Sequence, residues 1–294
     1  PIVPRMTSVT TRTVPIVPLW DSEDRPHCPN SYNIKTEGKM GKEKPVVSLI
    51  TVSYNSERTI SDTVESILKQ TYENIEYIII DGLSSDNTVK TAKSYASLLR
   101  EKGYGFKIVS EKDNGIYDAM NKGIKLSTGQ IAGILNSDDF YTNEFVIEKV
   151  VNKMISENAD CLYADLLYVD EFDTDKIVRK WKADKGDFRL GWNPPHPTTF
   201  ITKKTYDKFG LYKTNYKISS DYDLLYRIIH KGKVKTSYLE EYIVRMRVGG
   251  RSTSGIKSNI ISIKEIYATL KENNQKFKLP IVILRLLVKI KQFI

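Results

Sequence analysis

In the first half of the chain, short continuous apolar runs alternate with stretches of helical spacing. The apolar runs are short enough to be buried strands, and they lie at residues 46–52, 75–80, 106–109 and 130–135. After the first run, apolar residues recur at i, i+4, i+7 and i+8, the spacing of one helix face; they are Ile60, Val64, Ile67 and Leu68. Helices are also expected at 84–100 and 115–126. Strands alternating with helices predict parallel β-α-β units and an α/β fold.

The rest of the chain has a less regular pattern. We expect a strand at 161–169, a loop at 192–198 and a helix at 222–230. Residues 260–294 are helical in pattern, with a break at Pro280 before an apolar final segment. Residues 1–44 are rich in Pro, Thr, Ser and charge and have no sustained period, which is typical of a disordered leader or a cloning-derived segment.

The excess positive charge lies at the two ends of the chain. Residues 1–44 hold seven Lys and Arg against five Asp and Glu, and residues 251–294 hold nine against two. These surpluses of +2 and +7 account for the whole net charge of +9, so residues 45–250 are neutral. A nucleic-acid-binding protein more often has a basic face on its folded body. We therefore expect no nucleic-acid partner, and the basic tail favours an anionic membrane surface.

Cysteine usage and hydropathy indicate the cellular compartment in which the protein is expected to act. Cys28 and Cys161 are too far apart in sequence to form a zinc motif or a disulfide framework, which favours a reducing cytoplasm. No apolar run reaches the roughly 20 residues that a bilayer span needs. A cytoplasmic protein, peripheral at the inner membrane surface through residues 279–294, is the expectation. The alternative is that this last helix packs on the domain or on another subunit of a homo-oligomer.

Polar side chains follow three of the predicted strands. The first strand ends in Thr51, Ser53 and Tyr54, the second in Asp81, and the fourth in residues 136–139. The carboxyl ends of parallel strands meet at one edge of a sheet, so these side chains should converge on one crevice. Adjacent carboxylates such as Asp138 and Asp139 suit a hard cation, Mg²⁺ or Mn²⁺, which neutralises a leaving nucleotide.

Four sequence motifs occur in a specific order. They are VSLITVSYN at 47–55, IIDGLSSDNT at 79–88, EKDNGIYDAMNKGI at 111–124 and LNSDD at 135–139. This pattern, over about residues 46–250, resembles the family 2 glycosyltransferases of GT-A fold. The resemblance implies a GT-A-like (Rossmann-like) mixed, mainly parallel sheet with flanking helices, here followed by a C-terminal helical extension. The expected domain is 45–250, with a nucleotide-sugar half at 46–139, an acceptor half at 140–250 and a basic helical tail at 251–294.

The same resemblance implies an inverting transfer of a sugar from a nucleotide diphosphate, with UDP-sugars the expected donors, to an acceptor hydroxyl. It assigns roles to individual positions. On the donor side, Thr51 and Tyr54 would flank the uracil beside Ser53, Asp81 would hydrogen-bond the base, Asp138 would meet the ribose, Asp139 would bind the metal, and Asp113 and Asn121 would line the site. On the acceptor side, Asp221 would be the general base and His196 would lie in an acceptor loop. Residues 249–252 would form a flexible loop that closes over the diphosphate, where Arg247 or Arg251 would screen phosphate charge.

Two positions depart from the family pattern. Asn136 stands where many members have Asp, and Met120 stands where many have Arg. The first change removes a carboxylate from the metal motif, and the second removes a possible phosphate or base contact. The resemblance is to bacterial enzymes of capsule, exopolysaccharide or lipopolysaccharide assembly, whose acceptors are often lipid-linked carbohydrates.

Other interpretations stay open at this stage. Asp221 could be only a helix cap, His196 a structural turn residue, and Thr51 and Tyr54 packing residues. Asp223 competes with Asp221 for the role of base. A non-catalytic carbohydrate-binding or nucleotide-binding protein of the same fold is the alternative function. A dinucleotide-dependent oxidoreductase is disfavoured, because the turn after the first strand contains no glycine.

Overall fold

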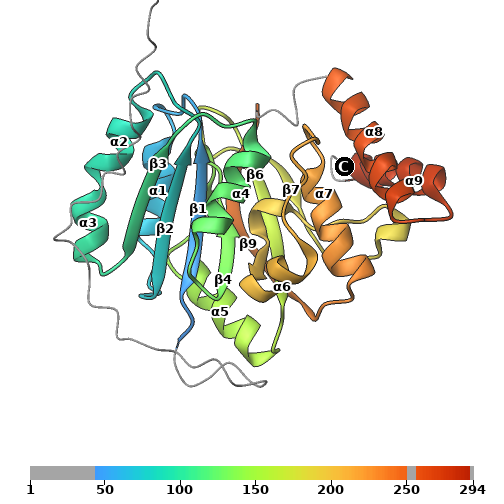
Figure 1. The fold of residues 1–294 in the computed structure, drawn as a ribbon, viewed down its shortest axis with the longest axis horizontal. Helices are drawn as coiled ribbons and strands as arrows, with labels where there is room; N and C mark the ends of the chain where they lie inside the picture. The colour runs from blue at the N-terminus through green and yellow to red at the C-terminus, as the bar shows by residue number, and fades with distance from the viewer. Residues whose placement is uncertain (1–43, 250–255, 292–294) are drawn as a thin grey trace, which may run out of the picture. The chain divides into compact units, whose positions relative to one another are not determined.

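The computed structural model describes residues 44–249 and 256–291. Within them, nine strands form a mixed sheet with helices on its faces (Figure 1). The strand order is β3-β2-β1-β4-β8-β6-β9-β5, and β7 pairs with β6 outside this path. The predicted leader at 1–44, apart from its last residue, and the predicted loop residue Arg251 lie outside the described residues.

The first half of the sheet is parallel, as its apolar runs predict. Its strands are β1 (Val47–Ser53), β2 (Ile75–Asp81), β3 (Gly105–Ser110) and β4 (Ile131–Ile134). Every residue of β1 and β2 is buried, as expected for central parallel strands covered on both faces. In the register, Ser53 lies opposite Asp81, and Asp81 lies opposite Ser110. The carboxyl ends of these three strands are therefore level with one another.

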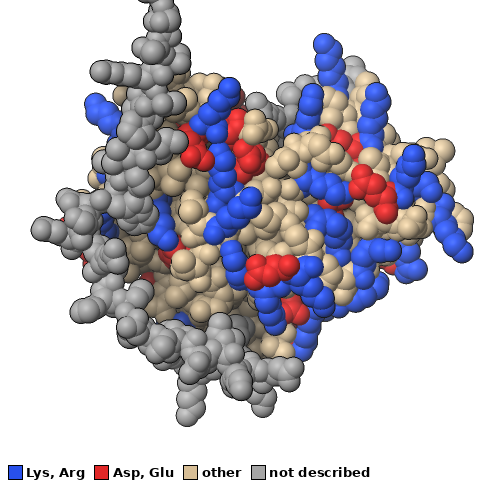
Figure 2. All heavy atoms as spheres, viewed as in Figure 1, with Lys and Arg blue, Asp and Glu red and all other residues tan. Residues whose placement is uncertain are grey.

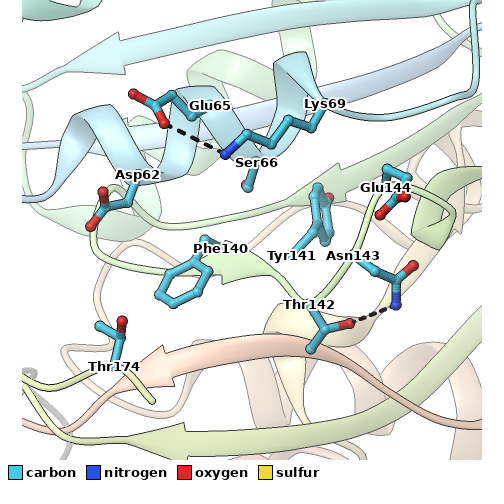
Figure 3. Close-up of a pocket in the computed structure, with 10 residues that line it drawn as sticks. All are labelled: Asp62, Glu65, Ser66, Lys69, Phe140, Tyr141, Thr142, Asn143, Glu144 and Thr174. Carbon is cyan, nitrogen blue, oxygen red and sulfur yellow. Dashed lines mark hydrogen bonds and ion pairs between the residues drawn. The ribbon is translucent and has the colours of Figure 1, made fainter.

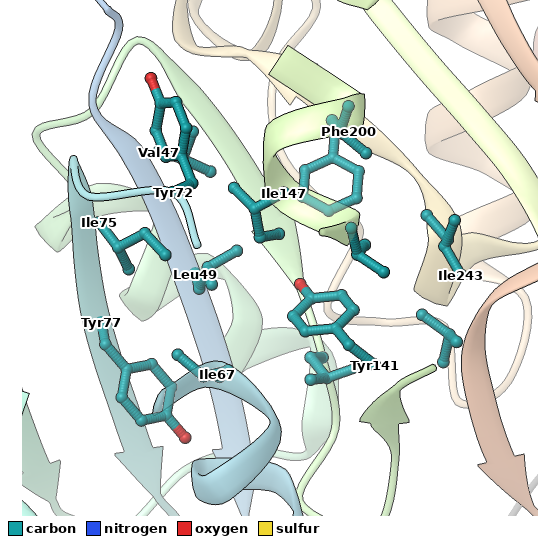
Figure 4. Close-up of a cluster of buried hydrophobic side chains, with 14 of the residues drawn as sticks. Val47, Leu49, Ile67, Tyr72, Ile75, Tyr77, Tyr141, Ile147, Phe200 and Ile243 are labelled. Atoms are coloured by element: carbon teal, nitrogen blue, oxygen red, sulfur yellow. The ribbon is translucent and has the colours of Figure 1, made fainter. Parts of the chain in front are cut away.

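Helices cover both faces of this sheet. On one face, α1 (Ile60–Leu68) and α5 (Val146–Ser156) pack over Leu49 and Tyr77 in the cluster drawn in Figure 4. On the other face, α4 (Ile116–Leu126) packs over Ile50. The predicted helix at 84–100 is instead two short helices, α2 (Thr88–Ser94) and α3 (Ala96–Glu101). They meet at Tyr95, whose hydroxyl donates to Glu65 of α1 at 2.9 Å.

The second half of the sheet is mixed. It contains β5 (Phe140–Tyr141), β6 (Cys161–Val169), β7 (Ile177–Trp181), β8 (Phe200–Thr202) and β9 (Thr236–Arg247). β9 runs parallel to β6, while β5, β7 and β8 pair antiparallel with their neighbours. The predicted strand at 161–169 is confirmed and Cys161 is buried within it, but β9 was not predicted. Many of its residues are only partly buried, so its sequence has no continuous apolar run.

The remaining helical elements lie between residues 188 and 291, and the last two of them are the longest. They are η1 (Phe188–Leu190), η2 (His196–Thr198), α6 (Lys203–Phe209), α7 (Ser220–Leu225), η3 (Tyr226–Lys231), α8 (Ile256–Glu272) and α9 (Lys278–Lys291). The chain breaks after α8, not at Pro280, which lies in the first turn of α9. Proline is tolerated there because the N–H it lacks would have no partner within the helix.

The last two helices pack against the rest of the described body. α8 contacts α7, and α9 contacts both α8 and η1 (Figure 1). Lys and Arg side chains project from the part of the surface where α8 and α9 lie (Figure 2). None of the helices within the described residues has both the length and the apolar composition that a bilayer span requires.

Candidate active site

The loops that follow β1, β2 and β4 are joined by polar side chains. The backbone N–H of Asn55 donates to Ser84 Oγ at 2.8 Å, and the N–H of Ser85 donates to Asn55 Oδ1 at 2.9 Å. Ser56 Oγ and Ser137 Oγ lie 2.8 Å apart. Three segments far apart in sequence are thereby fixed relative to one another at the carboxyl edge of the sheet.

Asp81 lies at the centre of this edge and is fully buried. Its carboxylate accepts hydrogen bonds from Ser53 Oγ at 3.1 Å, Ser110 Oγ at 2.6 Å, Ser84 Oγ at 2.5 Å and the Ser84 N–H at 2.9 Å. A carboxylate offers about four acceptor positions, so the protein itself fills them. A nucleobase N–H that binds Asp81, as the sequence predicts, has to displace one of these serine donors.

Two other predicted donor-site residues meet beside Asp81. A Cβ atom at Gly82 would lie 2.5 Å from Asp113 Oδ2 and 3.4 Å from Tyr54 Cδ2, so both side chains border this glycine. Tyr54 is 63% exposed, which leaves its ring available for stacking. Thr51 is in a different place, because it is fully buried and its Oγ1 accepts from Tyr77 at 3.2 Å. Gly82 follows the strand-end aspartate directly, and the sequence analysis did not predict that two site residues would meet beside this glycine.

Asn121 and Met120, on α4, are both buried. Asn121 Nδ2 donates to the carbonyl of Tyr212 at 2.8 Å, and the N–H of Tyr212 donates to Asn121 Oδ1 at 3.0 Å. Both the oxygen and the nitrogen of the amide are thus bonded to the backbone of Tyr212. The structure places Asn121 as a link between α4 and the segment at Tyr212, and its role toward a donor stays a prediction.

The acidic motif after β4 contains acceptor atoms that lack hydrogen-bond donors. Asp139 is fully buried, and its Oδ2 accepts from Asn136 Nδ2 at 3.0 Å. Asp139 Oδ1 and Asn136 Oδ1 are both buried without a partner. Burial and the neighbouring charge of Asp138 raise the pKa of Asp139 well above its ordinary value. Asp139 Oδ1, Asn136 Oδ1 and the neighbouring Asp138 carboxylate are oxygen ligands of the kind that a hard divalent cation takes. The described residues contain no group of three or more His, Cys, Asp or Glu side chains that could hold a metal ion.

Arg247, at the end of β9, lies against this motif. Its Nη1 donates to the carbonyl of Asp138 at 2.6 Å, its Nη2 pairs with Asp62 of α1, and its Cζ lies 5.1 Å from the Phe140 ring centroid. Burial raises the pKa of Asp138, and the charge of Arg247 partly opposes that shift. The side chain is 7% exposed, so screening of a phosphate by Arg247 stays a prediction.

Asp221 lies in the first turn of α7, and α8 fixes the loop that precedes it. Glu265 of α8 accepts hydrogen bonds from three consecutive N–H groups, those of Lys217 at 2.6 Å, Ile218 at 3.0 Å and Ser219 at 2.8 Å. The Tyr117 hydroxyl lies 2.5 Å from the Ile218 carbonyl and 3.5 Å from Asp221 Oδ1. No sequence motif pointed to Glu265, whose partners are backbone groups.

Asp223, the competing base, has a different environment. It is fully buried, pairs with Lys213 and with Arg227 at 2.7 Å each, and accepts from Thr269 at 3.2 Å. These contacts bind α7 to its surroundings. The geometry therefore favours Asp221 as the available carboxylate.

His196 and Tyr168 are two further side chains whose pKa is shifted by burial. His196 Nε2 is 2.6 Å from the Tyr212 hydroxyl; burial lowers its pKa, an effect that the charge of Asp221 opposes. Burial raises the pKa of Tyr168 on β6, and the charges of Asp139 and Asp221 both add to that shift. The charge of Arg179, whose Cζ lies 3.6 Å from the Tyr168 ring centroid, opposes the shift, and no sequence motif pointed to Tyr168.

A hollow of about 350 Å³ lies elsewhere, between α1 and the segment that contains β5 (Figure 3). Its lining includes Asp62 and Phe140, which both contact Arg247, but none of the predicted site residues. The hollow therefore does not include the side chains at the strand ends.

Several known proteins resemble the chain. It is 27% identical over 242 residues to a PGL/p-HBAD biosynthesis glycosyltransferase of Mycobacterium tuberculosis, covering 82% of this chain and 90% of that protein. Over 122 residues it is 34% identical to the UDP-Glc:alpha-D-GlcNAc-diphosphoundecaprenol beta-1,3-glucosyltransferase WfgD of Escherichia coli, covering 40% of this chain and 44% of WfgD. Its fold matches the mannosyltransferase PcManGT of Pyrobaculum calidifontis, solved with GDP-Man and Mn²⁺, with a TM-score of 0.62 and 16% identity over 83% of this chain and 69% of that chain.

These likenesses agree with the architecture described above. The fold match confirms the predicted GT-A-like α/β arrangement, with its mixed sheet and flanking helices. Residues 48–215, more than half of the chain, match the profile of Glycosyl transferase family 2. The match covers the strand-end loops and the acidic motif, so the chain belongs to glycosyl transferase family 2.

Proposed function

We propose that this chain is an inverting hexosyltransferase that moves a sugar from a nucleotide diphosphate sugar, most simply a UDP-sugar, to an acceptor hydroxyl. One observation carries the proposal. The acidic motif has buried oxygens without hydrogen-bond donors, and a second, partly exposed carboxylate lies on another element. Asp139 Oδ1 and Asn136 Oδ1 are buried acceptors without donors, whereas Asp221 is only partly buried at the start of α7. An inverting displacement needs a leaving-group site and a base on opposite faces of the sugar.

In this proposal each group of residues does one task. Tyr54, Asp81 and Asp113 hold the nucleoside at the strand ends, and Asp138 meets its ribose. Asp139, aided by Asn136, would hold Mg²⁺ or Mn²⁺, which when bound neutralises charge on the diphosphate. The Asp221 carboxylate accepts the proton of the acceptor hydroxyl as that oxygen forms its bond to the anomeric carbon.

The proposed acceptor is a carbohydrate on a lipid carrier at the cytoplasmic face of the membrane, in bacterial surface polysaccharide synthesis. WfgD, whose name gives a diphosphoundecaprenol-linked acceptor, supports this class. The basic charge of residues 251–294 and the apolar outer face of α9 support a peripheral contact with an anionic bilayer.

Donor hydrolysis tests the proposal without knowledge of the acceptor. A panel of UDP- and GDP-sugars is incubated with the protein and Mn²⁺ or Mg²⁺, and release of the nucleotide diphosphate is measured. We expect slow release from one donor, its loss in excess chelator and its return on adding either metal. Asp139→Asn should abolish this release without changing the thermal unfolding midpoint by more than a few degrees. Binding of a nucleotide sugar with neither hydrolysis nor transfer would instead support a non-catalytic member of the family.

A further inference from the structure

The C-terminal helix α9 is held tightly against the acceptor half. Gly191, with φ of +81°, lies at the contact, where a Cβ atom would be only 2.6 Å from Arg285 Cα. On the same side of α9, Ile281 and Val282 are 1% and 5% exposed. This close approach fixes the helix and therefore the direction of the Arg285 side chain.

Arg285 brings a positive charge to the neighbourhood of the candidate base. Its Nη1 donates to Asn193 Oδ1 in the 192–198 loop, and its Cζ lies 4.7 Å from the ring centroid of Tyr222, the residue after Asp221. None of the carboxylates in the described part of the chain forms an ion pair with it. A partly buried cation without an anionic partner is costly, so its neighbourhood is suited to a bound anion.

Its neighbours place Arg285 on the acceptor side. Burial lowers the pKa of Arg285, and Tyr222, Asp221 and Tyr168 are the groups that oppose this shift. The acidic motif that faces the donor diphosphate is instead in contact with Arg247. An anion bound by Arg285 would therefore belong to the acceptor, which Asp221 must also reach.

The opposite face of α9 indicates which anion this is. Leu279, Ile283 and Leu286 follow helical spacing and are 62%, 50% and 40% exposed. A helix with an apolar outer face and a cation on its inner face suits a ligand in which a phosphate joins a sugar to a lipid. Arginine's planar fork also matches phosphate geometry.

We propose that Arg285 binds the phosphate or diphosphate group of a lipid-linked acceptor, which makes α9 part of the acceptor site although it lies outside the 48–215 family match. This deepens the proposed function and rests on it. It names phosphate-linked saccharides as the acceptor class and gives one residue that selects them.

Undecyl diphosphate serves as the probe, because it carries the anion and a lipid chain without requiring knowledge of the sugar. Its affinity is measured with saturating UDP and Mn²⁺ present, so that the donor site is filled. We expect Arg285→Gln to weaken binding roughly ten- to hundredfold, as for loss of charge-assisted hydrogen bonds. Arg285→Lys, which keeps the charge but not the fork, should lose less.

The controls separate this proposal from its rivals. Lys278→Gln removes one charge from the same helix, at a side chain bonded to the Gln275 carbonyl, and should leave the affinity unchanged. An equal loss in Lys278→Gln would overturn the proposal in favour of nonspecific attraction. Weakened UDP binding in Arg285→Gln would assign the residue to the donor. Failure of the proposed function would appear separately, as no donor hydrolysis by the unmodified chain.

Discussion

Asp221 and Asp223 stand two positions apart on α7 and have unlike surroundings. Asp221 is partly buried near the Tyr117 hydroxyl, whereas Asp223 is enclosed by Lys213 and Arg227. Asp221→Asn keeps the shape and the capping ability of the side chain but removes its basicity. Transfer should fall roughly 10²-fold or more, while donor affinity and thermal stability stay near those of the unmodified chain. The measurement pairs transfer rate with donor titration.

Asp223→Asn is the matched control for that experiment. It leaves two cations beside a neutral amide in a buried site, so the free energy of unfolding should drop by about 3 kcal/mol. If Asp223→Asn folded normally and lost transfer while Asp221→Asn kept it, the base would be Asp223.

At single positions, the sequence predicted the candidate site residues better than it predicted the residues that hold them in place. Tyr54 and Asp113 do come together, at Gly82. Glu265 was not foreseen, because a glutamate that accepts from distant backbone N–H groups leaves no local pattern. Ser84, three residues after Asp81, was not recognised as one of its hydrogen-bond donors. Thr51 was grouped with Tyr54 by motif, yet strand alternation turns its side chain toward Tyr77.

Strands β1, β2 and β3 share a second polar network, at the end opposite the site. Glu76 is 6% exposed and accepts from Ser48 Oγ at 2.6 Å, the Thr128 N–H at 2.8 Å and Lys107 Nζ at 2.8 Å. Burial alone raises the pKa of Glu76, but the hydrogen bonds, from Lys107 first, bring it below 4.5. The charged form therefore stabilises the fold above about pH 4.5, and this contribution is lost as the pH falls through the lowered value.

Glu76→Gln should accordingly reduce the free energy of unfolding by about 2 kcal/mol near neutrality. The difference from the unmodified chain should hold from pH 7 to about pH 5 and shrink in more acidic solution. Urea denaturation across this range measures it, with the exposed Glu73→Gln as control. A difference that grew on acidification would have the wrong sign and refute this account of the network.

The predictability of elements follows from how completely they are buried. β1 and β2 are buried throughout and were predicted from their apolar runs. β9 was not, because partly buried strands carry charged residues along their length. The division between α2 and α3 at Tyr95 also escaped notice, since it depends on packing against α1 rather than on a proline or glycine.

At the scale of the whole molecule, helix α9 has two roles in our proposals. Its inner face contributes to the acceptor site, and its outer face contacts a membrane. The sequence predicted a basic tail that either lies on a membrane or packs on the domain. The inner face of α9 packs, through Ile281 and Val282, while Leu279, Ile283 and Leu286 remain exposed. Deleting residues 279–294 would therefore also remove buried contacts and Arg285. Such a deletion could not show the contribution of the outer face to membrane binding.

Replacing Leu279, Ile283 and Leu286 by Gln tests the outer face alone. The unmodified chain should co-sediment with vesicles that contain phosphatidylglycerol and less with pure phosphatidylcholine, and added salt should weaken this binding. The triple variant should bind at least about tenfold more weakly, because each side chain loses its apolar contact with the interface. The matched control replaces exposed apolar residues elsewhere by Gln and should bind normally; they are Leu98, Leu126 and Ile155. Equal sedimentation of the triple variant and the unmodified chain would reject the membrane contact. If the unmodified chain were a dimer and the triple variant a monomer, the outer face would instead bind a second copy of the chain.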